Sequence, residues 1–374
     1  MRVAVVVEQC WHRVPGGTAG AVVDQVAAVA ATGRVDQVGV AARHSRPPDD
    51  PWRPGIPVSH LPLPRAVLYP AWHHWRRPSV ERATGPVDVI HATGYAIPPR
   101  RRPLVVTLHD LAWRHDPSMF TRHGVRFFEA GLRCVRGDAD LVLCPSQATL
   151  EDCIAAGIER SRLRHVPWGM DGGAGGTVEV REGDGARVRM AYGLTGRYVL
   201  FVGTLEPRKN LPGLLEAFEL LTGDGRHRDV TLAVVGPTGW GESLQDRAAA
   251  LGDRVRLVGF VPRQDLAPLY GEAAVVCYPS LWEGYGLPVA EALAAGAAVV
   301  TSAGTATKEL VADGAGLAVD PRDPGAIAGA LATVLDDDDL ASRLRRAGRK
   351  RAAETTWAGT AAKVVAAYEE VAGR

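Results

Sequence analysis

The chain has 374 residues and a formal net charge of +1, with 46% hydrophobic and 23% charged residues. This length exceeds what one hydrophobic core usually organises, so we expect two domains. A general nucleic-acid binder is not expected, because that function needs a strongly basic surface. The five cysteines are scattered without a Cys-x-x-Cys pair, which predicts reduced thiols and neither a zinc nor an iron–sulfur site.

The N-terminal sequence predicts a buried strand and not a signal peptide. Residues 3–7 form a continuous apolar run, typical of a parallel strand buried on both faces. Gly16, Gly17 and Thr18 then open a helix predicted over residues 18–32. The segment lacks the Gly-x-Gly-x-x-Gly fingerprint, so nicotinamide binding is not expected. No apolar run is long enough to span a membrane, and we expect a cytoplasmic protein.

An aromatic and basic stretch, residues 68–77, follows a predicted strand at residues 38–41 and a proline-rich surface loop at residues 46–64. The stretch contains Trp72 and Trp75 together with histidines and arginines. Three interpretations are open: an acceptor-binding face, a contact with anionic lipid, or a packed helix whose arginines extend into water. Aromatic pairs at this spacing more often pack in a core, so we favour the third.

Two further strands are predicted at residues 87–92 and 104–109. The second brings His109 and Asp110 to its carboxyl end, where open α/β sheets bind their ligands. A helix at residues 122–137, a strand at residues 141–144 and a helix capped by Ser146 follow. A run of glycines then predicts a linker, which we place at residues 172–196, between a first domain of residues 1–171 and a second of residues 197–356.

The second domain opens with a buried strand at residues 198–203. Thr204 follows this strand, and Arg208 and Lys209 stand shortly before the next helix. Adjacent cations in a strand-to-helix loop can neutralise a diphosphate. Other elements predicted here are helices at residues 211–221 and 266–273 and strands at residues 230–235, 255–258 and 297–301.

The most informative stretch joins a buried strand, residues 273–278, to a helix that begins at Pro288 and ends near Gly296. The loop amides and the first turn of this helix favour an anion. The carboxylates of Glu283 and Glu291 would repel a phosphate and instead suit the hydroxyl groups of a ribose or a sugar. The stretch therefore predicts a nucleotide-sugar site.

The pair Glu283 and Glu291, with Gly284-Tyr285-Gly286-Leu287-Pro288 between them, resembles the signature of retaining nucleotide-sugar-dependent glycosyltransferases of the GT-B fold, family 4 (group 1). The resemblance covers nearly the whole length and is sharpest in the second domain. It implies an α/β protein of two facing doubly wound, Rossmann-like domains with an interdomain cleft. In this fold the first domain binds the acceptor, and the terminal helix, about residues 357–374, packs back on that domain.

The resemblance also implies roles for site residues. Glu283 would orient the sugar hydroxyls, Glu291 would hold the ribose, and His109 would reach the donor sugar across the cleft. Arg208 and Lys209 would stabilise the departing diphosphate, with a larger share of the charge because Thr204 stands where many relatives carry arginine. The remaining donor-binding positions implied are Gly16, Gly17, Phe260, Val261, Gly284, Tyr285, Gly286 and Leu287.

The expected reaction is metal-independent transfer of a hexosyl group to a hydroxyl or amine of a glycan, a lipid-linked glycan or a small molecule. No cofactor is expected beyond the nucleotide sugar, and the local context of Arg208 and Lys209 favours mannose carried by GDP. Two alternatives are open: a nucleotide-sugar epimerase on the same architecture, and a non-catalytic nucleotide-binding subunit. Peripheral contact with the inner face of a membrane is also open, as is the oligomeric state.

Overall fold

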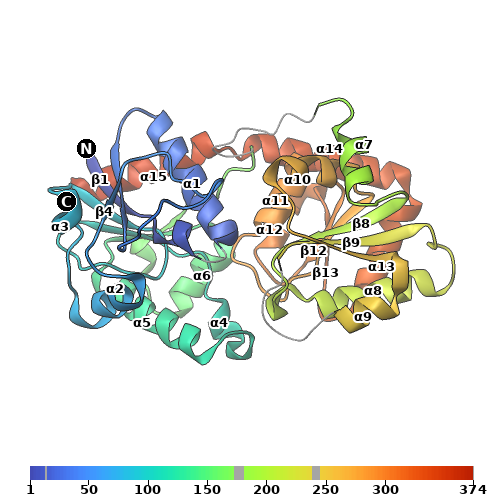
Figure 1. The fold of residues 1–374 in the computed structure, drawn as a ribbon, viewed down its shortest axis with the longest axis horizontal. Coiled ribbons are helices and arrows are strands. Elements are labelled where there is room, and N and C mark those ends of the chain that lie inside the picture. Colours follow the sequence, from blue (N-terminus) through green and yellow to red (C-terminus); the bar gives the residue numbers. More distant parts are fainter. Residues whose placement is uncertain (13–14, 172–180, 238–244, 374) are drawn as a thin grey trace. The chain divides into compact units, whose positions relative to one another are not determined.

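The computed structural model describes residues 1–12, 15–171, 181–237 and 245–373. The chain forms two compact units (Figure 1). The first contains residues 1–169 together with the C-terminal residues 355–374, and the second contains most of residues 170–354. No helix of the described residues is long and apolar enough to cross a bilayer.

The first unit is built on a sheet of seven parallel strands in the order β3-β2-β1-β4-β5-β6-β7. Because β2 and β4 lie on opposite sides of β1, the order of connection reverses between β1 and β4, which is the point where such sheets bind ligands. The strands are β1 (Arg2–Val6), β2 (Asp36–Ala41), β3 (Val58–His60), β4 (Val89–Ala92), β5 (Leu104–Thr107), β6 (Leu141–Cys144) and β7 (Leu163–His165).

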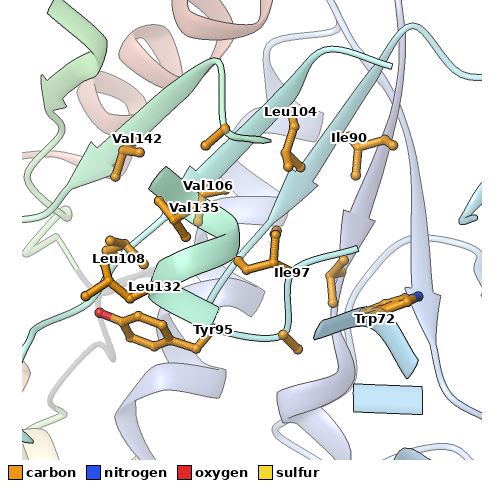
Figure 2. Close-up of a cluster of buried hydrophobic side chains, with 14 of the residues drawn as sticks. Trp72, Ile90, Tyr95, Ile97, Leu104, Val106, Leu108, Leu132, Val135 and Val142 are labelled. Carbon is orange, nitrogen blue, oxygen red and sulfur yellow. The ribbon is translucent and has the colours of Figure 1, made fainter. Parts of the chain in front are cut away.

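Alternate residues of these strands enter two different cores, one on each face of the sheet. Val3 and Val5 pack with α1 and α15, whereas Ala4 and Val6 belong to the core that contains Trp72. Figure 2 shows part of this second core, with Leu132 and Val135 of α5 beside strand residues such as Val106 and Val142. The helices are α1 (Gly16–Ala31), α2 (Arg65–Pro70), α3 (Glu81–Thr84), α4 (Ala112–His115), α5 (Arg122–Asp138), α6 (Gln147–Ala155) and α15 (Trp357–Ala372).

Helix α15 follows the second unit in sequence but packs within the first. Its apolar stripe includes Val364, Val365 and Tyr368, all fully buried. The Tyr368 hydroxyl lies 2.7 Å from Nδ1 of His91 on β4, so a polar contact adds to the apolar packing.

The second unit has six parallel strands in the order β10-β9-β8-β11-β12-β13. The order of connection here reverses between β8 and β11. The strands are β8 (Arg197–Val202), β9 (Val230–Val235), β10 (Val255–Gly259), β11 (Val275–Tyr278), β12 (Val299–Ser302) and β13 (Leu317–Val319). The helices are α7 (Asp184–Ala191), α8 (Leu211–Gly223), α9 (Gln245–Ala250), α10 (Arg263–Glu272), α11 (Leu287–Ala294), α12 (Thr307–Leu310), α13 (Pro324–Asp336) and α14 (Asp338–Glu354).

Each unit is thus a doubly wound parallel sheet, which confirms the predicted fold class, but several boundaries were wrong. The predicted linker at residues 172–196 contains α7, which packs against α10 and whose Arg187 pairs with Asp265 at 2.8 Å. Residues 172–180 lie outside the described residues. The proline-rich loop contains the short edge strand β3, and helix α1 begins at Gly16, two residues before the predicted start.

The aromatic stretch at residues 68–77 divides between a buried and an exposed part. Trp72 is fully buried, as the packed-helix interpretation requires, and its Nε1 donates to the carbonyl of Pro78 at 2.9 Å. Trp75 is 70% exposed. The helix is also interrupted, because α2 ends at Pro70 and a wider turn continues over Ala71–Trp75.

Candidate functional site

The predicted cations and one predicted carboxylate meet at the reversal point of the second sheet. Arg208 and Lys209 lie in the loop after β8, and Glu283 lies in the loop after β11, which is the strand next to β8. A backbone hydrogen bond from Leu281 N to Arg208 O (2.8 Å) joins the two loops. The sheet topology therefore brings together residues that are 74 positions apart.

Lys209 is buried with its charge compensated by Glu283. Its Nζ donates to Glu283 Oε1 at 2.6 Å and to the Tyr278 hydroxyl at 2.5 Å. Burial lowers the pKa of Lys209, and Arg208 lowers it further, while Glu283 acts in the opposite direction. Burial alone would raise the pKa of Glu283, but Arg208 and Lys209 outweigh it and lower this pKa to about 2. Glu283 is therefore an ionised acceptor at neutral pH.

Arg208 also holds Glu283 in place. Its Nη1 lies 3.0 Å from Glu283 Oε2 and donates to the Trp282 carbonyl at 2.9 Å. Its Nη2 donates to Glu206 Oε1 at 2.8 Å. Two cations and two carboxylates thus form one charge-balanced cluster, and we name these four residues, Glu206, Arg208, Lys209 and Glu283, the β8–β11 charge cluster. A diphosphate that approaches it competes with the carboxylates for the two cations.

Glycine is required where the backbone turns into α11. Gly286, the residue before the helix, has φ +98°, and a Cβ there would lie 2.5 Å from Thr307 Cγ2. The positive φ and the short distance to Thr307 both exclude a side chain at position 286. Helix α11 begins at Leu287, so Pro288 is its second residue and not its first as predicted, and Glu291 lies in the second turn. In the first turn Pro288 has no N–H, and the N–H groups of Val289 and Ala290 donate to the Gly286 carbonyl at 2.9 and 3.1 Å. The positive end of the helix dipole still favours an anion at this end of α11.

A second glycine brings neighbouring loops close together at the same edge of the sheet. Gly236, after β9, has φ +141°, and a Cβ there would lie 2.0 Å from the Gly203 carbonyl oxygen. Its N–H donates at 2.8 Å to the carbonyl of Gly259, the last residue of β10. The loops after β8, β9 and β10 therefore meet through backbone atoms.

Glu291 receives a hydrogen bond from a tyrosine that the sequence did not indicate. The Tyr270 hydroxyl, on α10, donates to Glu291 Oε2 at 3.0 Å. Burial raises the pKa of Tyr270 well above its ordinary value, and the Glu291 charge adds to this effect, so the phenol stays protonated and donates. Tyr270 is buried and Glu291 is exposed, which leaves the carboxylate accessible at a fixed orientation.

The other donor-binding positions of the second unit lie along the same edge. Thr204 follows β8, and its carbonyl accepts the Glu206 N–H at 2.9 Å. In the turn after β10, Val261 is buried whereas Phe260 is 67% exposed. Gly284 and Tyr285 are buried in the loop before α11.

His109 belongs to the first unit, beyond the carboxyl end of β5. Its Nε2 lies 2.8 Å from the Thr93 carbonyl and so donates to it. Its Nδ1 is buried and makes no hydrogen bond with the described residues. Burial lowers the pKa of His109. The neutral ring therefore carries its proton on Nε2 and offers a lone pair at Nδ1.

Gln9 and Thr93 support this arrangement at the reversal point between β1 and β4. Gln9 Nε2 donates to the Thr93 carbonyl at 3.0 Å and to its hydroxyl at 2.5 Å. Asp110 Oδ1 accepts the Ala112 N–H at 3.0 Å, so Asp110 has a capping role. Gly16 and Gly17 form the start of α1 in the same unit, and Gly16 has φ +60°.

Sequence reasoning missed Glu206, Tyr278, Tyr270 and Thr93. Glu206 and Tyr278 lie at the carboxyl ends of β8 and β11, within segments that the sequence analysis had identified. Because ligands bind at this end of the strands, their position could have marked both residues as site candidates. Tyr270 lies on a helix, and its contact with Glu291 depends on the packing of α10 beside α11.

Comparison with known proteins identifies the family. The family model "Glycosyl transferases group 1" matches residues 191–351, and "Glycosyltransferase Family 4" matches residues 15–172. The chain is 31% identical to O-antigen chain mannosyltransferase B of Escherichia coli over 75% of its own length and 74% of the relative's. The chain belongs to the family 4 glycosyltransferases. This confirms the resemblance seen in the sequence.

Other family 4 members are similar over different lengths. A D-inositol 3-phosphate glycosyltransferase of Acidothermus cellulolyticus is 31% identical over 90% of this chain and 81% of the relative. A phosphatidyl-myo-inositol mannosyltransferase of Mycolicibacterium smegmatis is 36% identical, and the match covers 49% of this chain and 47% of that protein.

Solved structures show that the fold is that of GT-B glycosyltransferases. The lipopolysaccharide glycosyltransferase WaaG superposes with a TM-score of 0.74 over 100% of both chains at 20% identity. Anabaena Alr3699/HepE in complex with UDP-glucose superposes with a TM-score of 0.75 over 98% of this chain and 100% of that one at 21% identity. This family 4 protein is accordingly a hexosyltransferase that uses a nucleotide-sugar donor.

Proposed function

We propose that this family 4 glycosyltransferase transfers a mannosyl group, with retention of configuration, from GDP-mannose to a hydroxyl or amine of a glycan, a lipid-linked glycan or a small molecule. The observation that carries the proposal is the β8–β11 charge cluster, in which Lys209 and Arg208 hold an ionised Glu283 at the reversal point of the second sheet.

The cluster can exchange its ion pairs when the donor binds. A diphosphate beside the first turn of α11 supplies Lys209 with a new anionic partner. Glu283, released from Nζ, then accepts hydrogen bonds from sugar hydroxyls. Before the donor binds, the cluster holds as many cations as carboxylates. After the donor has bound, hydrogen bonds from the sugar hydroxyls stabilise the negative charge of Glu283.

Leaving-group stabilisation in this proposal comes from the protein. As the bond between the anomeric carbon and the phosphate oxygen breaks, negative charge grows on the diphosphate next to Lys209 and the helix N-terminus. We propose that no metal ion and no further cofactor are needed. Unchanged turnover in the presence of a chelator supports this, and loss of turnover that Mg²⁺ restores contradicts it.

The nucleoside is proposed to bind along the carboxyl edge of the second sheet. Glu291, oriented by Tyr270, accepts from the ribose hydroxyls. The exposed ring of Phe260 offers an apolar face to the base, next to Val261. Thr204 and the loop of Gly284, Tyr285, Gly286 and Leu287 surround the diphosphate.

In the first unit, we propose that His109 binds a hydroxyl of the transferred sugar. The neutral ring accepts a hydrogen bond through Nδ1. The hydrogen bond from Nε2 to Thr93 holds the proton on Nε2, so that Nδ1 remains the acceptor. Gly16 and Gly17 at the start of α1 are proposed to allow close approach of donor phosphate.

Retention is proposed to follow from attack on the same face that the diphosphate leaves. The acceptor oxygen forms the new bond to the anomeric carbon, the bond to the phosphate oxygen breaks, and the acceptor proton passes to the departing phosphate. No protein nucleophile is needed. NMR of the product tests this step: the same anomeric configuration as in the donor supports it, and the opposite configuration contradicts it.

The donor itself can be tested with a panel of nucleotide sugars. Relatives include named mannosyltransferases, which supports mannose. A cognate donor stabilises the folded protein by mass action, so GDP-mannose should raise the melting temperature most among GDP- and UDP-hexoses. A larger shift with a UDP-hexose would overturn the choice of donor while leaving the reaction class in place.

We further propose that the enzyme works in the cytoplasm, with a peripheral contact on the inner membrane face. All five cysteines are free thiols, which suits a reducing compartment. A surface hollow of about 990 Å³ in the first unit is lined by exposed Trp75 and Val67 and by exposed arginines, namely Arg77, Arg82, Arg101 and Arg102. Such a combination suits anionic headgroups.

Vesicle sedimentation tests the membrane contact. Vesicles that contain phosphatidylglycerol should bind the protein and pure phosphatidylcholine vesicles should not. The Trp75→Ala/Arg77→Ala variant should weaken this binding. Equal binding of the variant and the wild type would contradict the contact.

A further inference from the structure

A second pocket, of about 380 Å³, lies in the first unit beside the edge strand β3. It is lined by residues of the loops after β1 and β2, by the segment that leads into β3 and by β3 itself. The size suits one sugar ring with a substituent. We name it the β3 pocket.

The walls of the β3 pocket combine aromatic rings with cations. Trp11, His44 and His60 supply the rings, and Arg46 and Arg53 supply the charge. None of the described lining residues is acidic, although Asp49 and Asp50 lie in the same loop. The described pocket surface therefore presents cations and no carboxylate, while Glu8 lies behind His44 and Asp50 lies 3.7 Å from Arg53.

A buried carboxylate fixes one of these rings. Glu8 is 1% exposed, and its Oε2 accepts the Ala42 N–H at 2.7 Å. His44 Nε2 lies 3.0 Å from both carboxylate oxygens and so donates to Glu8. Burial of a carboxylate is costly unless it is paired. The burial of Glu8 thus lowers the stability of the fold while it holds the His44 ring at the pocket wall. Nδ1 is the second polar atom of this ring.

The other two rings are fixed by backbone contacts. His60 Nδ1 donates to the Ala42 carbonyl at 2.7 Å, and Trp11 Nε1 donates to the Arg46 carbonyl at 2.8 Å. The Trp11 ring stacks on His44 with centroids 4.9 Å apart and planes within 10°. The aromatic wall is therefore rigid before any ligand arrives, which lowers the entropic cost of binding.

The arginines remain available to a ligand. Arg46 has an exposed side chain that makes no ion pair among the described residues. Arg53 lies 3.7 Å from Asp50, but the two side chains are 57% and 80% exposed, and such a surface pair contributes little. Guanidinium groups bind phosphate and carboxylate in a bidentate manner.

From these observations we infer that the β3 pocket binds an anionic saccharide unit of the acceptor, a sugar that carries a phosphate or a carboxylate. Arg46 and Arg53 bind the anionic group, while His44, His60 and Trp11 contact the ring and its hydroxyls. The inference rests on the proposed function, since it assigns the pocket to the acceptor of the same reaction.

Calorimetric titration of the full chain tests this inference. Mannose 6-phosphate, glucuronate and mannose are titrated in the presence of saturating GDP, which occupies the donor site. The variants are Arg46→Ala/Arg53→Ala and, as a matched control, Arg43→Ala, an exposed arginine of the same loop that does not line the pocket.

We expect at least one of the two anionic sugars to bind at least tenfold more tightly than mannose, and the stronger one identifies the anionic group. The double variant should lose this preference, and Arg43→Ala should keep it. Mannose binding as tightly as both anionic sugars, no binding at all, or an unchanged preference in the double variant would overturn the inference.

The same variants separate this inference from the proposed function. Affinity for the nucleotide sugar should be equal in the wild type and in Arg46→Ala/Arg53→Ala. Absence of any nucleotide-sugar binding to the wild type would count against the proposed function, whereas normal donor binding without a preference for anionic sugars would count against the β3 pocket alone.

Discussion

Lys209 Nζ lies 2.6 Å from Glu283 Oε1, although the two residues are only 8% and 6% exposed. Removal of one partner from a buried pair costs about 3–5 kcal/mol. Arg208 shares the carboxylate, so Glu283 keeps a cation when Lys209 turns to another anion. The pair is therefore suited to exchange partners and not only to stabilise the fold.

Glu283→Gln should lower kcat by about 100-fold or more, since a preorganised charged acceptor is lost. Affinity for the nucleotide should change little, because Lys209 and the helix N-terminus remain. Steady-state kinetics and nucleotide titration measure the two effects. Glu219→Gln, an exposed glutamate on α8, is the control. A Glu283→Gln enzyme that transfers sugar at the wild-type rate would remove this residue from the mechanism.

Lys209→Ala should weaken donor binding and also lower kcat, because the lost cation contacts the diphosphate in both the ground state and the transition state. The donor KM and kcat/KM report the two losses. Lys308→Ala, at an exposed position of α12, should behave as the wild type. Unchanged donor kinetics in Lys209→Ala would exclude Lys209 from the site.

The variant Arg208→Lys tests whether the positive charge of Arg208 or the geometry of its guanidinium group matters for turnover. The variant keeps the positive charge but cannot contact Glu206, Glu283 and the Trp282 carbonyl together, as the guanidinium does. We expect kcat to fall by about tenfold or more with a smaller change in donor KM. Arg226→Lys, on the surface, is the matched control. A larger change in KM than in kcat would instead indicate direct phosphate binding by Arg208.

The sequence predicted the β8–β11 region well because its signals are local. Apolar runs marked β8 and β11, glycines and Pro288 marked the start of α11, and the resemblance supplied the roles of Glu283 and Lys209. Ser146 was likewise found as a cap, and its Oγ accepts the Thr149 N–H at 3.0 Å.

The remaining features depend on side-chain directions or on contacts between segments that are distant in sequence. The ion pair between Arg208 and Glu206, and the contact of Tyr270 with Glu291, follow from side-chain directions that no periodicity encodes. Helix α7 was missed because Ala186, Val188 and Met190 alternate with arginines and form no helical stripe. Only Val188 is buried, and the Arg187–Asp265 pair helps to hold the helix. Strand β3 is only three residues long.

Tyr270→Phe should raise the donor KM several-fold with a smaller effect on kcat, because the Glu291 carboxylate loses a donor that orients it toward the ribose. Tyr192→Phe is the matched control, since that hydroxyl, on the residue after α7, donates to Asp265 at 2.7 Å and not to Glu291. Equal kinetics of Tyr270→Phe and the wild type would show that this contact does not position Glu291.

The buried His91 should make the stability of the first unit depend on pH. Burial, with a smaller contribution from the neighbouring His109, lowers the folded-state pKa of His91 from 6.5 to about 3. The unfolded chain therefore takes up a proton first as the pH falls, so the stability contributed by neutral His91 is full above about pH 6.5 and is lost between pH 6.5 and 3.

Urea unfolding at pH 7 and pH 4.5 measures this effect. The wild type should lose up to about 3 kcal/mol more over this interval than His91→Gln. His123→Gln, which removes an exposed histidine on α5, should lose as much as the wild type. The same loss in His91→Gln and in the wild type would contradict the assignment.

The most direct test is a crystal structure of the wild type with an unreactive donor analogue, because Glu283→Gln would itself release Lys209. We predict a diphosphate oxygen within hydrogen-bonding distance of Lys209 Nζ and beside the N-terminus of α11, with the ribose at Glu291. A diphosphate bound elsewhere, or a Lys209 that makes no contact with it, would contradict the central claim.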